Sequence, residues 1–330
     1  MTPTLSVIIP VADGGADFQR CLAALAASTL KPDEVIVVDD GSTDDSRRWA
    51  AEAGARVLTT GRPGCGPALA RNLGAERAVG DVLFFVDADV EVRPETLARL
   101  RDAFAADPDL AALFGSYDDA PGDPGFVSQY KNLMHHYVHQ TGSERASTFW
   151  SGCGAIRRDL FLKYGGFSAR YHIPSIEDIE LGTALARDGR RIRLDRGLQV
   201  KHLKRWTLIS LLRSDILARG IPWTRLILRT RRMPDDLNLG MASRFSVALV
   251  YLGWLCLAVG AFWPPAWALA LTAGGALAWL NRAVYAFFWR KRGFRFMLGA
   301  VAMHWLYYTY NGLSFGLGLL LHLREALAKR

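Results

Sequence analysis

Cysteine is scarce in this sequence, which has four cysteines among 330 residues. They lie far apart, and no two of them have the C-x-x-C spacing of a zinc site: Cys21, Cys65, Cys153 and Cys256. This distribution excludes a zinc site of that kind and a disulfide framework. It is typical of a protein in a reducing compartment.

The sequence also lacks charge over a long stretch near its end. Between residues 245 and 321 charged side chains nearly vanish, apart from Arg282, the run 290–292 and Arg295. This shift near Met241 predicts a boundary between a water-soluble domain and a membrane domain. The first ten residues show no basic start followed by a long apolar run, so we expect no signal peptide and a cytoplasmic catalytic domain.

Positive charge is concentrated before this boundary. Residues 187–232 contain fourteen Lys or Arg, opposed by three Asp. Nucleic-acid binding is one interpretation of such a patch. Its position before an apolar run of membrane length favours anionic lipid head groups or phosphorylated substrates, and we expect no nucleic-acid partner.

The first half of the chain alternates apolar runs with amphipathic segments. The pattern predicts strands at residues 5–10, 34–39, 56–58 and 82–86, and helices at 18–27, 68–78 and 94–106. This alternation predicts an α/β domain with a mostly parallel sheet covered on both faces. Residues 115–125, rich in Gly, Pro and Asp, are expected to form a loop.

Acidic residues follow two of the predicted strands. The pair Asp39-Asp40 ends the second strand, and Asp87-x-Asp89 follows the fourth. Ligands of such sheets bind at the carboxyl ends of strands. Carboxylate oxygens suit Mg²⁺ or Mn²⁺, so Asp87-x-Asp89 predicts a site where a cation neutralises a diphosphate.

A further acidic pair, Glu177-Asp178, opens a predicted helix that runs to about Arg187. Ser175 with Asp178 three residues on resembles a capping pair, because acidic groups favour the positive end of a helix. The alternative is that Asp178 is a general base. The two interpretations are compatible, because a helix end holds a carboxylate in place.

Six segments in order along residues 5–206 resemble inverting family-2 glycosyltransferases with the GT-A, Rossmann-like nucleotide-sugar fold. They are Ser6-Val7-Ile8-Ile9-Pro10, Val38-Asp39-Asp40-Gly41-Ser42-Thr43-Asp44, Ala70-Arg71-Asn72-x-Gly74, Val86-Asp87-Ala88-Asp89, Ser151-Gly152-Cys153-Gly154 with Gly165-Gly166-Phe167, and Glu177-Asp178. Each segment is modest evidence, whereas all six in order are specific.

The resemblance implies roles for individual residues. Asp178 would deprotonate the acceptor hydroxyl, with Glu177 on the acceptor side, and Asp89 would bind the metal. The nucleotide-sugar would contact Pro10, Asp39, Asp40, Arg71, Asp87 and Ala88. For Arg71, the alternative is an ordinary residue on the surface of a helix.

The segment 202–206 lies where processive polysaccharide synthases of the family have Q-x-x-R-W. Here His202 replaces Gln, which argues against processive polymerisation. His202 is either a structural residue or a metal ligand. Trp206 either stacks on an acceptor sugar or anchors at a membrane interface.

Two long apolar runs predict a membrane hairpin. They are residues 245–262 and 263–288, broken by Pro264-Pro265, with basic clusters on both outer sides. A third run, 296–321, either spans or is re-entrant. The expected divisions are therefore a GT-A domain (1–205), a basic interfacial region (206–240) and a membrane domain (241–330) in a multi-pass inner-membrane protein.

These features favour transfer of one sugar from a nucleotide-diphosphate sugar to a lipid-linked or polysaccharide-precursor acceptor, with Mg²⁺ or Mn²⁺ as cofactor. Membrane lipids would be further partners. The alternatives are a processive polysaccharide synthase, a nucleotidyltransferase, and a catalytically inactive membrane scaffold with a transferase-like domain. The sequence does not identify the sugar, the base of the nucleotide or the acceptor.

Overall fold

The computed structural model describes residues 2–233 and 240–328 and divides the chain into two compact units, Met1–Arg205 and Trp206–Arg330. Residues 234–239 of the expected interfacial region and residues 329–330 of the expected membrane domain lie outside the described residues.

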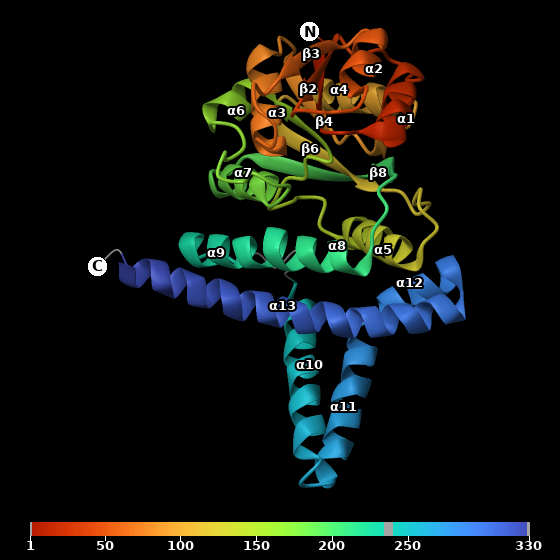
Figure 1. The fold of residues 1–330 in the computed structure, drawn as a ribbon, viewed down its shortest axis with the longest axis vertical. Helices are drawn as coiled ribbons and strands as arrows, with labels where there is room; N and C mark the ends of the chain where they lie inside the picture. Colours follow the sequence, from red (N-terminus) through yellow and green to blue (C-terminus); the bar gives the residue numbers. More distant parts are fainter. Residues whose placement is uncertain (1, 234–239, 329–330) are drawn as a thin grey trace. The chain divides into compact units, whose positions relative to one another are not determined.

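The first unit is built on one mixed sheet of eight strands (Figure 1). The strands are β1 Leu5–Val11, β2 Glu34–Asp39, β3 Arg56–Thr59, β4 Val82–Val86, β5 Val90–Glu91, β6 Leu110–Tyr117, β7 Cys153–Arg157 and β8 Arg191–His202. Their order across the sheet is β3-β2-β1-β4-β7-β6-β8-β5. β3, β2, β1 and β4 are parallel to one another, whereas β7 is antiparallel to both of its neighbours. The four predicted strands are therefore confirmed as β1 to β4.

Seven helices connect these strands within the described residues. They are α1 Gly15–Ala26, α2 Ser46–Glu52, α3 Pro67–Arg77, α4 Thr96–Ala106, α5 Phe126–Thr141, α6 Arg158–Lys163 and α7 Glu177–Arg187. The predicted helices at 18–27, 68–78 and 94–106 correspond to α1, α3 and α4. The first unit therefore has the mixed α/β architecture that the sequence predicts.

Alternating side chains of the central strands bury both faces of the sheet. On one face, Val7 and Phe84 join the core formed with apolar residues of α1 and α4. On the other face, Ile8 packs so closely on α3 that a Cβ at Gly74 would lie 2.6 Å from its Cγ2. Glycine at position 74 therefore lets α3 approach the strands that carry the acidic turns.

Two local expectations need correction. The predicted loop at residues 115–125 is found at 118–125, but residues 115–117 belong to β6, because β8 pairs alongside them. At Gly115 a Cβ would lie 2.2 Å from the Leu198 carbonyl oxygen, so this glycine permits close strand pairing. The expected capping pair does not form either, since the N-cap residue of α7 is Ile176 and no side chain caps it.

The second unit is helical over its described residues. It contains α8 Leu208–Arg213, a π-helix η1 Ser214–Gly220, α9 Ile221–Thr230, α10 Met241–Val259, α11 Pro265–Leu280, α12 Arg282–Arg292 and α13 Phe294–Ala328. α10 and α11 lie side by side, and α13 runs across one end of this pair with α9 beside it (Figure 1). Polar groups join the three segments: Tyr308 donates to Asn281 Oδ1 (2.9 Å), and Asn281 Nδ2 donates to Ser246 Oγ (3.0 Å).

One helix of the described chain, α10, is long and apolar enough to cross a membrane, by length and composition. α11 is apolar but has 16 residues, because the helix ends at Leu280. The second segment of the expected membrane hairpin, residues 263–288, is thus divided between α11 and α12. A hairpin of two membrane spans is therefore not supported. The third apolar run lies in the unbroken helix α13.

Candidate active site

The acidic turns of the first unit meet at one edge of the sheet. β1 lies between β2 and β4 and is parallel to both, so the turns after these three strands share that edge. Asp39 ends β2, and Asp87 follows β4 directly. Pro10 pairs in register with Val38 near the end of β1. The sheet therefore brings together the nucleotide-sugar residues predicted from separate motifs.

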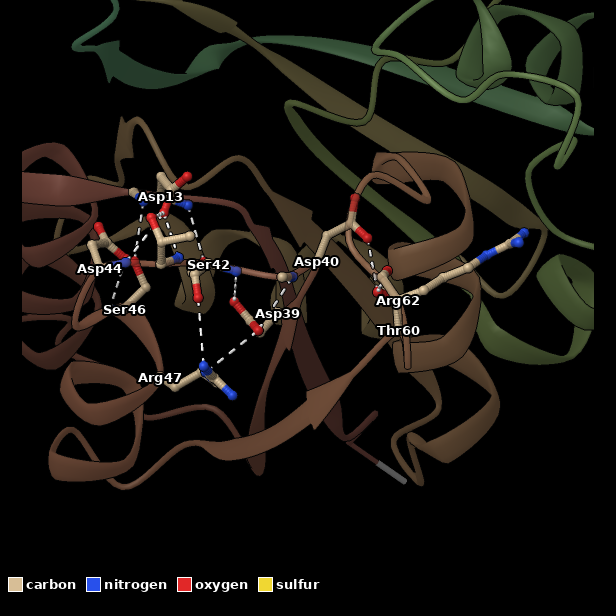
Figure 2. A network of polar contacts seen from close by, with 12 residues as sticks. Asp13, Asp39, Asp40, Ser42, Asp44, Ser46, Arg47, Thr60 and Arg62 are labelled. Atoms are coloured by element: carbon tan, nitrogen blue, oxygen red, sulfur yellow. Dashed lines mark hydrogen bonds and ion pairs between the residues drawn. The ribbon is translucent and has the colours of Figure 1, made fainter.

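Asp39 closes the turn that follows β2 (Figure 2). Its Oδ1 accepts a hydrogen bond from the Ser42 amide (3.0 Å) and its Oδ2 one from the Gly41 amide (3.3 Å). The Arg47 Nε lies 3.6 Å from Oδ2, and the carboxylate is buried. Asp39 thus has a structural task in the turn in addition to the proposed contact with a nucleotide.

Asp40 holds a different loop, the one that leads from β3 into α3. Its Oδ1 accepts from the Thr60 hydroxyl (2.8 Å) and the Cys65 amide (2.9 Å), and its Oδ2 accepts from the Gly66 amide (2.8 Å). Figure 2 shows the carboxylate directed toward Thr60, away from the Asp39 turn. Donors of the chain itself therefore occupy much of the hydrogen-bonding capacity of Asp40.

Asp13 is a further acidic residue at this edge of the sheet, and the sequence did not predict it. It has a positive φ of 49°, and its Oδ1 accepts from the Thr43 amide (2.6 Å), the Thr43 hydroxyl (3.0 Å) and the Asp44 amide (3.2 Å). These bonds hold the pKa of Asp13 below its ordinary value. Figure 2 shows Asp13 beside Asp44 and Ser42. The signal that would have found it is the Asp-Gly pair after the first strand.

Arg71 of α3 is buried beneath the site rather than exposed on the helix surface. Its Nη2 lies 2.5 Å from Asp87 Oδ1, and its Nη1 lies 3.2 Å from Glu177 Oε1. Burial opposes the charge of the guanidinium, but the neighbouring carboxylates outweigh it and raise the pKa of Arg71. Arg71 therefore links the turn after β4 to the start of α7.

Asp178 lies in the first turn of α7 with three protein donors. Its Oδ2 accepts from the Ser151 amide (2.9 Å) and hydroxyl (3.0 Å), and its Oδ1 accepts from the Ile179 amide (2.8 Å). Burial raises the pKa of Asp178 above its ordinary value, although the Ser151 amide and Arg71 oppose this. A carboxylate has about four acceptor positions, so one remains on Oδ1 for a proton.

Glu177 is buried beside Asp178 but is directed to other partners. Its Oε1 faces Arg71, and its Oε2 accepts from the Ser175 amide (2.8 Å). Burial and the adjacent Asp178 carboxylate raise the pKa of Glu177 despite Arg71. Both oxygens of Glu177 therefore have partners from the protein, which favours a supporting role.

Asp89 and His202 face each other across the β5–β8 pair. Val90 pairs with His202 in the sheet, and the Leu203 amide donates to the Asp89 carbonyl (2.9 Å). Burial would raise the pKa of Asp89, but His202 and then Lys204 more than offset it, so this pKa is lowered. Asp89 is therefore a carboxylate at neutral pH.

The side chains of Asp89 and His202 suit a divalent cation. Asp89 Oδ2 and His202 Nε2 are 3.6 Å apart, which is longer than a hydrogen bond. Within the described residues no group of three or more His, Cys, Asp or Glu is arranged to hold a metal ion. Cations such as Mg²⁺ commonly take one or two protein ligands and complete their shell with substrate phosphates and water, so the pair fits such an ion.

The remaining predicted residues divide between the two units. Ala88 is half-buried between Asp87 and Asp89 and packs against the main core. Trp206 is the first residue of the second unit.

Comparison with known proteins points to one family. Residues 6–165 match the model of "Glycosyl transferase family 2". The uncharacterized glycosyltransferase YibD of Escherichia coli is 40% identical over 177 residues, which cover 49% of this chain and 51% of YibD. The chain thus spans about half the length of this relative.

Two further proteins are similar over longer stretches. An N-acetylglucosaminyl-diphospho-decaprenol L-rhamnosyltransferase of Mycobacterium tuberculosis is 29% identical over 224 residues, covering 57% of this chain and 72% of that protein. A mannosyltransferase of Pyrobaculum calidifontis, solved with GDP-mannose and Mn²⁺, superposes with a TM-score of 0.59 at 20% identity, covering 96% of this chain and 87% of that one. At this identity the likeness shows the fold, which is of the GT-A type. Over residues 6–165 the chain is therefore similar to glycosyl transferase family 2.

Proposed function

We propose that this protein transfers one sugar from a nucleotide-diphosphate sugar to a lipid-linked or polysaccharide-precursor acceptor, with inversion at the anomeric carbon. The observation that carries the proposal is Asp178, a buried carboxylate with a raised pKa at the sheet edge. Such a group is a suitable base for a hydroxyl near neutral pH.

In the proposed reaction, Asp178 Oδ1 accepts the proton of the acceptor hydroxyl. The hydroxyl oxygen forms a bond to the anomeric carbon on the face opposite the diphosphate. The bond between that carbon and the diphosphate oxygen breaks, and the electron pair leaves with the diphosphate. One displacement of this kind inverts the anomeric configuration.

The other residues orient the two substrates. Ser151 directs the Asp178 carboxylate through two hydrogen bonds, and Arg71 holds Asp87 in place. Asp39, Asp40 and Pro10 would border the nucleotide. A Mg²⁺ or Mn²⁺ ion bound by Asp89 and His202 would neutralise charge on the leaving diphosphate.

A lipid-linked acceptor is supported by the second unit and by one relative. Large apolar side chains are exposed along α10, α11 and α13, among them Trp254, Leu271 and Leu320. α10 meets the length and hydropathy of a membrane span. The relative from Mycobacterium tuberculosis is named for a decaprenol-linked substrate. We therefore propose that α10 inserts into the inner membrane, and that Trp206 lies on the acceptor side.

The test is a donor screen with the full-length protein purified in detergent. UDP-, GDP- and dTDP-sugars are supplied singly with a polar lipid extract, and release of the nucleoside diphosphate and labelling of the lipid are measured. One donor should give both products, and Asp178→Asn should give neither at a comparable rate. Absence of nucleotide release with every donor would contradict the proposed activity.

A further inference from the structure

His202 is held on two sides by residues that have no assigned role. Its Nδ1 lies 2.6 Å from Asn132 Oδ1, and its ring stacks on Tyr117 at 4.2 Å between centroids with an 8° angle between planes. Asn132 is 1% exposed and His202 is 4% exposed. Since both are buried, neither this hydrogen bond nor the stack competes with bulk water.

The hydrogen-bond partner of His202 Nδ1 determines whether Nδ1 or Nε2 carries the proton of a neutral imidazole. Because Asn132 Oδ1 is an acceptor, Nδ1 carries the proton in the hydrogen bond. In a neutral imidazole the other nitrogen, Nε2, then has a lone pair. Nε2 faces the Asp89 carboxylate, 3.6 Å away, so a divalent cation bound between them would take the place of the proton through which His202 otherwise acts on Asp89. With the Asp89 side chain 28% exposed, a cation held by this carboxylate and Nε2 would keep positions open for phosphates and water.

Helix α5 and strand β6 build this support from a distant part of the sequence. Asn132 and His136 lie four residues apart on α5, and His136 Nδ1 is 2.7 Å from the carbonyl oxygen of Tyr117. The helix therefore fixes both groups that contact the His202 ring. No motif of the family resemblance includes them.

We propose that Asn132 is a positioning residue that presents Nε2 of His202 to a divalent cation shared with Asp89. We further propose that the imidazole ligand makes this site bind Mn²⁺ more tightly than Mg²⁺. The inference rests on the proposed function, because it assigns the cation of that site. Outer partners of a metal-bound histidine fix its tautomer and ring orientation. Mg²⁺ prefers oxygen ligands and water, whereas a nitrogen ligand suits transition metals better.

The test measures Mn²⁺ itself rather than turnover. Free Mn²⁺ is titrated into the full-length protein in detergent, and bound Mn²⁺ is observed by pulsed electron paramagnetic resonance, which detects a ¹⁴N nucleus in the coordination shell. The wild-type protein should show ¹⁴N coupling, and more Mg²⁺ than Mn²⁺ should be needed to displace half of the bound ion. Asn132→Leu should lose the coupling and about 10–100-fold of the Mn²⁺ affinity.

Two variants control for damage to the fold. Asn132→Asp keeps an acceptor opposite Nδ1, so it should retain the ¹⁴N coupling and the affinity. Gln140→Leu removes another side-chain hydrogen bond of α5, the 2.9 Å bond to the Arg196 carbonyl, and should leave Mn²⁺ binding unchanged.

Wild-type affinity and coupling in folded Asn132→Leu would overturn the proposal, as would failure of Asn132→Asp to retain them. Absence of ¹⁴N coupling in the wild-type protein, or equal affinity for the two ions, would also overturn it. Nucleoside diphosphate release in the donor screen decides the sugar-transfer function independently of these outcomes.

Discussion

The variant Asp178→Asn tests whether Asp178 is the catalytic base or a carboxylate with a structural role alone. The asparagine keeps one oxygen for the Ser151 amide and hydroxyl, but its NH₂ group replaces the acceptor of the Ile179 amide. A buried donor without a partner costs about 1–3 kcal/mol of stability. If Asp178 is the base, turnover should fall by roughly 10²–10⁴-fold. That loss corresponds to about 2.7–5.4 kcal/mol of barrier, at about 1.36 kcal/mol for each tenfold.

The two effects are measured on the same preparation. Thermal unfolding reports stability, calorimetric titration reports donor affinity, and steady-state nucleotide release reports turnover. Donor affinity should persist, because Asp178 is assigned to the acceptor. Glu180→Gln is a matched control, since Glu180 is an acidic residue of the same first helical turn that pairs with Arg170 at 2.9 Å. It should keep turnover close to that of the wild type.

Near-normal turnover of folded Asp178→Asn would refute the assignment and leave the residue with a structural role. Loss of donor affinity together with turnover would instead place Asp178 in the donor site. In either case the buried Glu177 would become the next carboxylate to test.

Three further predictions follow from the same contacts. Asp178 must be ionised to act, so activity should fall as the pH drops through its raised pKa. Ser151→Ala removes one of the hydrogen bonds that lower this pKa, so the fall in activity should occur at higher pH than in the wild type. An unchanged pH profile on the acid side would contradict this. Arg71→Gln should destabilise the protein by about 3–5 kcal/mol and lower the Tm, because it leaves Glu177 buried without its charged partner; an unchanged Tm would be the contrary result. Carbonate washing should leave the protein in the membrane fraction because of α10, and clean release would oppose insertion.

Much of the fold follows from local sequence, including α7 in the second half of the chain, whereas the pairing of distant strands does not. Strands β1, β2 and β4 are continuous apolar runs bounded by turn residues, so their pattern alone predicts them. The loop expected at residues 115–125 begins only after Tyr117, because Gly115 is in β6 through contact with Leu198 of β8, which lies far along the chain. No local pattern reveals such a partner.

The same limit applies to the site. The positions of Asp39 and Asp87 follow from strand ends, because parallel strands share an edge. Arg71 is buried with Glu177 as its partner. The two residues lie far apart in the sequence, so no local pattern predicts the pair. Asn132 has no sequence signal, since an asparagine in an amphipathic helix is ordinarily a surface residue.

The lengths of two helices in the second unit suggest how the protein would respond to bilayer thickness. At 1.5 Å per residue, the 19 residues of α10 extend about 28 Å, close to a hydrocarbon core of about 30 Å. The 35 residues of α13 extend about 52 Å, far more than that core. If α10 is inserted as proposed, thinning or thickening of the membrane by a few ångströms would create hydrophobic mismatch along this helix. Lipids of different chain length reconstituted around the protein would change the match between α10 and the hydrocarbon core.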